Sequence, residues 1–297
     1  MQPRPHDDAS RAPGAGDGGA AGARAQGLPT LEVLVSTFGD RIDRALEVPL
    51  DPIPGVSWLI VHQLGDGARA ADRAPPGPVP GRPDVRRVEL DGRGLSRSRN
   101  RALDEGRADL LLLADDDVRH SPQRLEAVRR AFAERPGADL LTFEIESSDG
   151  TPHRAYPARE YRHGRISAFH VASIEMAVRA RLVRDLPVRF DERFGLGARY
   201  PACEETVFLV DCLRAGASAS FVPTYIVSHP PGSSGSDWSR PLSREVRGAL
   251  FRRVFGPLAG LPLLVAFAAR QRRHFRGRCT VAGFLADALP AFVRFTP

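Results

Sequence analysis

Three consecutive acids, Asp115, Asp116 and Asp117, end a short and wholly apolar segment, residues 110–114. The segment has no polar face and is too short for a typical helix, so it predicts a strand buried on both sides. Side chains alternate along a strand, so Asp115 and Asp117 are expected to point one way and Asp116 the other. Converging carboxylates repel each other unless a cation lies between them, and such ligands suit Mg²⁺ or Mn²⁺. The alternative is an acidic loop before a helix capped by Ser121.

Three arginines, Arg97, Arg99 and Arg101, lie in the first turns of a helix that is predicted to run from Ser96, its N-cap, to about Gly106. Free backbone N–H groups and guanidinium groups at a helix start can together bind an anion. A solvated basic face is the alternative. Because this helix leads directly into the acidic strand, the order indicates a parallel β/α/β unit.

Two adjacent glutamates, Glu204 and Glu205, follow a glycine-hinged loop, residues 190–197, and begin a helix that is expected to end at Gly216. Adjacent residues at a helix start point about 100° apart, so both cannot reach one hydroxyl group. One carboxylate can act as a general base while the other caps or braces the helix. Stabilisation of both acids by the helix dipole is the alternative.

The elements that must position these residues indicate an α/β fold. We predict a surface loop at residues 65–84. Strands are predicted at residues 31–37, 58–62, 85–90 (edge-like), 139–147 and 172–178, with two short strands at 220–222 and 225–227, and helices at 180–186 and 243–275.

Three segments are distinguished by composition. Residues 1–28 are rich in Gly, Ala, Pro and Asp and predict a disordered tail. One domain is expected over residues 29–238, and a helical extension over residues 239–297. Within the extension, residues 256–269 are apolar and flanked by arginines. Spanning a bilayer takes about 20 residues, so this segment is predicted either to lie in a membrane interface or to pack on the main domain.

Overall composition limits the partners and the compartment. The net charge is +6, from 42 basic and 36 acidic residues, and every residue of the basic 42 is arginine, which makes bidentate contacts with phosphates. No nucleic-acid partner is expected. The 3 cysteines form no paired framework and no metal spacing, and no apolar leader opens the chain. We therefore expect a location in the cytoplasm or at the inner face of the membrane.

The motifs in order resemble a known family. Residues 94–103 followed by 110–117 look like the core of family-2 glycosyltransferases with the GT-A fold, a single Rossmann-like nucleotide-binding domain with a mixed, mostly parallel sheet. Residues 190–197 followed by 204–209 look like that family's acceptor-side segment, and the resemblance covers about residues 29–235. It implies a nucleotide-sugar donor, a divalent metal and inversion at the anomeric carbon.

The resemblance also implies roles for individual residues. The metal ligands would be Asp117, Asp115 and His229, and the base would be Glu205, the second acid of its pair, with Glu204 in reserve. Two turns depart from the family pattern, at residues 36–39 and 62–67, which leaves the donor base and sugar open. The donor site would comprise Ser36, Thr37, Phe38, Gln63, Arg97, Arg99, Asn100, Asp115 and Asp116.

We therefore predict an inverting glycosyltransferase that uses Mn²⁺ or Mg²⁺ and moves a sugar from a nucleoside-diphosphate donor to an acceptor hydroxyl. The acceptor would be a glycan or a lipid-linked molecule in polysaccharide or envelope glycan synthesis, with peripheral membrane contact as a further expectation. Two alternatives are a metal-dependent nucleotidyltransferase and a non-catalytic membrane-surface adaptor on a GT-A scaffold. The nucleotidyltransferase would need a glycine-rich loop after the first strand, which residues 36–40 match poorly, and the adaptor would be supported by loss of the acids, which are present.

Overall fold

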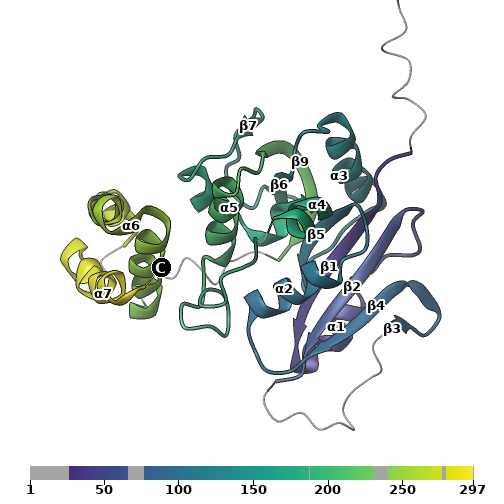
Figure 1. The fold of residues 1–297 in the computed structure, drawn as a ribbon, viewed down its shortest axis with the longest axis horizontal. Helices are drawn as coiled ribbons and strands as arrows, with labels where there is room; N and C mark the ends of the chain where they lie inside the picture. Colours follow the sequence, from purple (N-terminus) through teal and green to yellow (C-terminus); the bar gives the residue numbers. More distant parts are fainter. Residues whose placement is uncertain (1–26, 66–76, 187, 231–239, 276–278, 297) are drawn as a thin grey trace, which may run out of the picture.

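A computed structural model describes residues 27–65, 77–186, 188–230, 240–275 and 279–296, so the predicted tail lies almost wholly outside the described residues. The described strands form one sheet in the order β3-β4-β2-β1-β5-β8-β6-β9-β7. The prediction of an α/β fold with a mixed sheet and a C-terminal helical extension is confirmed (Figure 1).

The first half of the sheet is parallel and builds the donor-side edge. It contains β1 (Leu31–Phe38), β2 (Val56–Gln63), β4 (Arg82–Leu90) and β5 (Leu110–Asp115). All of β1 except its last residue is buried, as expected for a central strand covered on both faces. The register pairs β1 with both neighbours so that the carboxyl ends of β1, β2 and β5 lie together.

Helices cover both faces of these strands. Helix α2 (Leu95–Glu105) packs Ala102 and Leu103 against one face, and α3 (Pro122–Glu134) packs Leu125 and Phe132 against the other. The short α1 (Ile42–Leu46) lies on the α3 side. The apolar residues of each helix recur at helical spacing, so each helix buries one stripe and leaves its polar face in solvent.

The second half of the sheet is mixed. Strand β8 (Met176–Arg179) runs antiparallel to β5 and to β6 (Leu140–Ser147). Strand β9 (Ala219–His229) runs parallel to β6, and β7 (Tyr161–Arg162) pairs with β9 at the outer edge. Helix α4 (Ala180–Asp185) follows β8, and α5 (Glu204–Arg214) precedes β9.

Four local expectations are corrected by the structure. The two short strands near Tyr225 are the single strand β9, which continues through Pro223 because register shifts there remove the need for its N–H. The predicted surface loop contains β3 (Gly77–Val79), which pairs with β4, so β4 is not at the edge. Residues 173–175 form a 3₁₀ turn rather than the start of β8. Finally, Gly94 and not Ser96 is the N-cap of α2.

The C-terminal extension is a helical hairpin. Helix α6 (Pro241–Gln271) kinks at Gly256, where φ is 74°, and α7 (Val281–Arg294) packs back along it. Both helices lie to one side of the sheet, with α5 between them and the strands (Figure 1). Their shared core contains Phe251, Leu264 and Phe284. Val246, Leu250 and Val254 of α6 join the core of the main domain, whereas Leu264 and Ala268 of the apolar segment 256–269 pack within the hairpin, so the two alternatives for that segment stay open.

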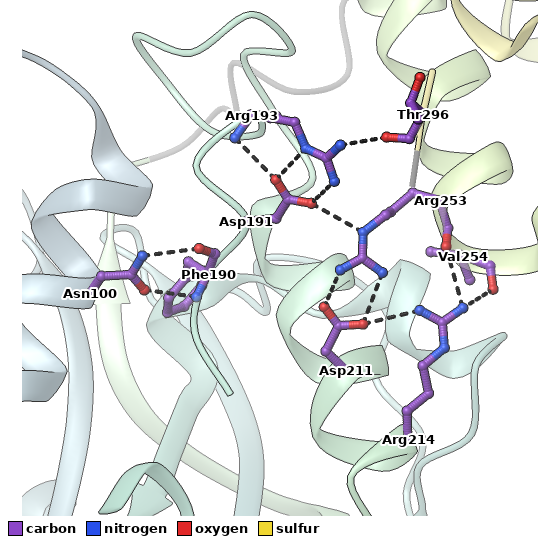
Figure 2. A network of polar contacts seen from close by, with 9 residues as sticks. All are labelled: Asn100, Phe190, Asp191, Arg193, Asp211, Arg214, Arg253, Val254 and Thr296. Atoms are coloured by element: carbon purple, nitrogen blue, oxygen red, sulfur yellow. Dashed lines mark hydrogen bonds and ion pairs between the residues drawn. The ribbon is translucent and has the colours of Figure 1, made fainter. Parts of the chain in front are cut away.

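An ion-pair network fastens this hairpin to the loop before α5 (Figure 2). Arg253 of α6 donates to Asp191 in the loop at 3.0 Å and to both oxygens of Asp211 in α5 at 2.5 and 3.0 Å. Asp191 also accepts from Arg193, which reaches the Thr296 carbonyl at 2.6 Å. The extension therefore positions the segment that the sequence assigns to the acceptor side.

Candidate active site

The three acids at the end of β5 have different sets of partners. Asp115 accepts a hydrogen bond from Arg99 at 3.0 Å. Asp116 is buried and accepts from the Thr37 hydroxyl at 2.7 Å and from Arg41. Asp117 lies beside His229, with Arg41 at 3.4 Å. The strand ends at Asp115, so the alternation of a strand does not extend to Asp117, and the shared direction of Asp115 and Asp117 stays a prediction.

Asp117 and His229 form a pair that fits a divalent cation. Asp117 Oδ1 is buried without a hydrogen-bond partner and lies 3.5 Å from His229 Nε2. An unpaired carboxylate oxygen facing an imidazole nitrogen is a donor set that Mn²⁺ accepts. The proximity of His229 lowers the pKa of Asp117, and Asp117 raises the pKa of His229. Asp115 does not join them, and among the described residues no three His, Cys, Asp or Glu side chains converge.

Arg99 links the end of β5 to the start of α5. Its guanidinium group is 2% exposed and donates to Glu204 at 2.7 Å, to Asp115 at 3.0 Å and to the Ser173 hydroxyl at 2.6 Å. Desolvation by burial lowers the pKa of Arg99, but the charges of its two carboxylate partners more than offset this, so the pKa is raised. Both terminal nitrogens of Arg99 are bonded to protein groups, and its Nε is buried without a partner, so the guanidinium group is enclosed by protein and does not support the predicted phosphate contact.

The neighbours of Arg99 on α2 either hold the helix to another segment or face solvent. Asn100 accepts from the Phe190 N–H at 2.7 Å and donates to the Phe190 carbonyl at 3.0 Å, which ties α2 to the acceptor-side loop (Figure 2). Arg97 is 44% exposed at its side chain and only 4.0 Å from Glu192. Arg101 pairs with Glu105 one turn away. Of the arginines on this helix, Arg97 therefore has the freest guanidinium group at the helix start.

The ends of β1 and β2 are joined by short polar contacts. Ser36 accepts from the Ser98 hydroxyl at 2.9 Å. Gln63 donates to the Thr37 carbonyl at 3.3 Å and accepts from the Gly94 N–H at 2.7 Å. Phe38 remains 37% exposed, with the Arg93 guanidinium carbon 5.1 Å from its ring centroid. Gln63 thus fixes the start of α2 beside β1, while Phe38 offers an open aromatic surface.

The two glutamates of α5 have different surroundings. Glu204 is buried and bonded to Arg99, and the glycine at 195 leaves room for it, since a Cβ there would lie 3.3 Å from the Glu204 carboxyl carbon. Glu205 is partly buried, and its side chain has no hydrogen bond or ion pair with any other described residue. Desolvation, with the Glu204 charge second, raises the pKa of Glu205 to about 8.

Two site residues were missed by sequence reasoning. Arg41, which bridges Asp116 and Asp117, lies three residues after β1, and a search for basic residues just after the predicted strands would have found it. Ser173, which accepts a hydrogen bond from Arg99, carries no sequence signal because it approaches from a 3₁₀ turn 74 residues away.

Comparison with known proteins gives a family match for part of the chain and a shared fold. Residues 71–186, which contain the arginine helix and the acidic strand end, match the sequence profile of Glycosyl transferase family 2. No protein with a curated description matches the sequence.

Several solved structures are similar. TarS of S. aureus, residues 1–349, in complex with UDP-GlcNAc has a TM-score of 0.56 at 14% identity, over 89% of this chain and 78% of TarS 1–349. The same TarS fragment with UDP has a TM-score of 0.52 at 14% identity, over 83% and 72% of the two chains. A mycobacterial protein has a TM-score of 0.51 at 17% identity, over 79% and 77%.

These results support the class predicted from the sequence: residues 71–186 match Glycosyl transferase family 2, and the solved structures share the fold of the chain, an α/β domain that matches the GT-A fold with a helical extension. The profile match covers the segment that contains the arginine helix and the acidic strand end, and the solved structures show the shared fold alone.

Proposed function

We propose that the protein transfers a sugar, with inversion, from a nucleoside-diphosphate sugar to an acceptor hydroxyl. The observation that carries this proposal is the joint bonding of Arg99 to Asp115 on the donor side and to Glu204 on the acceptor side. One guanidinium group therefore holds the end of β5 next to the start of α5, where the two substrates of a transfer reaction must meet.

The donor would bind over the carboxyl ends of β1, β2 and β5. Phe38 offers a ring on which a base can stack, the Arg93 guanidinium carbon lies 5.1 Å from the centre of that ring, and Arg97 has an exposed guanidinium group at the start of α2. Asp117 and His229 would hold Mn²⁺ or Mg²⁺, which when bound would neutralise charge on the diphosphate leaving group. Because TarS binds UDP-GlcNAc, this is the first donor to test.

Glu205 is the proposed base. Its carboxylate takes the proton of the acceptor hydroxyl while the hydroxyl oxygen bonds to the anomeric carbon. The bond from that carbon to the diphosphate oxygen breaks, and its electron pair leaves with the diphosphate. A carboxylate whose pKa is raised to about 8 holds a proton more strongly than an ordinary glutamate, which suits a general base. Glu204 acts as the brace, because its carboxylate is already bonded to Arg99.

The test is a comparison of Glu205→Gln with Glu204→Gln, using UDP release from UDP-GlcNAc and Mn²⁺. Glu205→Gln should leave UDP affinity near wild type and lower turnover by about 10²-fold or more, the usual scale for a lost general base. Wild-type turnover should rise about tenfold per pH unit below pH 8 and level off above it, because only ionised Glu205 accepts a proton. Full turnover in Glu205→Gln, or an unchanged pH profile, would place the base elsewhere.

We also propose that the α6–α7 hairpin rests on the inner face of a membrane, which suits a lipid-linked or envelope glycan acceptor. Helix α6 is long and apolar enough to cross a membrane by length and composition alone. However, the kink at Gly256 leaves about 15 residues beyond it, roughly 22 Å of helix, which is shorter than the bilayer core of about 30 Å. Residues 257–269 carry no charge and bury only Gly260, Leu264 and Ala268.

Sedimentation with vesicles tests this placement. The full chain should sediment with anionic vesicles at low salt and less at high salt, since the exposed arginines at 270, 272 and 273 would be screened. Leu258, 90% exposed, is the residue to change: Leu258→Glu should reduce sedimentation, while Arg130→Gln on α3 should not. Equal recovery of all three proteins in the supernatant at low salt would leave the hairpin a purely packed element.

A further inference from the structure

An open cavity of about 540 Å³ lies on the second half of the sheet, away from the acids of β5. It is formed by β6, β9 and the segment that follows β6. Its lining residues are Glu144, Pro152, Arg154, Ala155, Tyr156, Pro157, Ala158 and Tyr225. The family resemblance assigned no role to any of them.

Glu144 brings an unpaired carboxylate to this cavity. The residue is only 8% exposed, and its side chain makes no hydrogen bond or ion pair with any described residue. Burial alone raises its pKa. Neither carboxylate oxygen is among the fully buried atoms that lack a partner, so the carboxylate reaches the open cavity. A ligand group that donates a hydrogen bond can therefore meet it there.

The opposite wall is aromatic and held in place. The rings of Tyr156 and Tyr225 meet edge to face, with centroids 6.5 Å apart. The Tyr156 hydroxyl and Arg154 both donate to the buried Glu175, at 2.8 and 2.7 Å. The Arg154 guanidinium carbon also lies 4.6 Å from the centre of the Tyr156 ring. These bonds fix the wall before any ligand arrives.

The charges around the cavity select a neutral ligand. A cation would be attracted by Glu144 but repelled by Arg154. An anion would be attracted by Arg154 but repelled by Glu144. A sugar unit satisfies both, because its hydroxyl groups can donate to Glu144 and accept from Arg154. Its C–H faces can pack against the tyrosine rings, which provide rigid apolar area beside polar groups.

Both strands that line the cavity continue to the level of His229, the partner of Asp117. Glu144 pairs with Tyr225, and Ser147 pairs with His229, on the same two strands. Tyr225 precedes His229 by four residues, which is about 13 Å of strand. The ring of His153, which lies between two lining residues, meets the His229 ring at 5.7 Å. A chain of a few sugar units can span that distance along the surface.

We propose that this cavity is a distal acceptor subsite that binds a neutral sugar unit of a glycan whose reacting hydroxyl lies at the donor site. The inference rests on the proposed glycosyl transfer. It assigns Glu144, Tyr156 and Tyr225 to acceptor specificity, at a distance from the reacting atoms.

Binding of four trisaccharides, chitotriose, maltotriose, cellotriose and mannotriose, tests the subsite by saturation-transfer NMR on the full chain. At least one should bind, and Glu144→Gln should raise its dissociation constant about tenfold, the scale of a lost hydrogen bond to a charged group. Glu146→Gln is the matched control, because Glu146 is on the same strand but bonded to Arg124 at 2.5 Å. Tyr225→Ala should weaken binding similarly and serves if Glu144→Gln does not fold.

The outcomes separate the subsite from the proposed function. Binding of UDP with Mn²⁺, measured on the same samples, should be unchanged in every variant. If the wild type binds UDP but none of the trisaccharides, or binds one equally well after both substitutions, the subsite is refuted and glycosyl transfer stands. If a trisaccharide binds through Glu144 but no nucleoside diphosphate binds to the wild type, glycosyl transfer is refuted and the sugar site stands.

Discussion

Arg99→Met removes the charge that connects the two halves of the site while keeping most of the side-chain volume. The substitution would leave Glu204, which is 6% exposed, as a buried carboxylate without its cationic partner. Breaking a buried pair from one side typically costs about 3–5 kcal/mol. The partner Asp115 adds little, since its side chain is 34% exposed and solvent can replace the lost contact. We therefore expect a loss of about 3–5 kcal/mol.

Urea unfolding followed by fluorescence of the native tryptophans measures this loss. With a slope of about 3 kcal/mol/M, the unfolding midpoint should fall by at least about 1 M. Arg101→Met is the control on the same helix, because Arg101 is 44% exposed and makes only a surface pair with Glu105. That change should cost less than about 1 kcal/mol.

A double-mutant cycle then tests the cause. If the unpaired Glu204 charge is responsible, Arg99→Met should cost much less in a Glu204→Gln background, with a coupling energy of about 1–3 kcal/mol. An equal cost in both backgrounds would refute the reasoning. So would a loss in Arg99→Met no larger than that in Arg101→Met, because the buried ion pair would then contribute no more than an exposed one.

Two further predictions follow from the same site. Asp117→Asn should abolish the Mn²⁺ dependence of UDP binding in calorimetry. Asp116→Asn should mainly lower the melting temperature, since the Asp116 carboxylate is bonded to Thr37 and Arg41. An unchanged Mn²⁺–UDP affinity in Asp117→Asn would contradict the assignment. Gly195→Ala should destabilise the fold by at least about 1 kcal/mol, because φ is 98° and the new Cβ would lie 2.8 Å from Ser96 Oγ; a midpoint equal to wild type would show that the loop relaxes freely.

The sequence alone determined the elements whose signals are local. The apolar segment before Asp115 is buried as predicted, and Ser121 caps α3 by accepting from the Arg124 N–H at 3.3 Å. Both signals depend on hydrophobicity and hydrogen bonding among near neighbours in the chain. The ordered motifs were specific enough to indicate the family before any coordinates were considered.

The tertiary structure decided which partner each functional side chain has. Arg97 and Arg99 carry the same guanidinium group two residues apart, yet the first is exposed and the second is buried against Glu204, 105 residues away. Likewise, Glu204 and Glu205 are identical in type, and only the position of Arg99 leaves one bonded and the other free of a described partner. Such differences depend on contacts across the fold, and the residue type at a position carries no information about them.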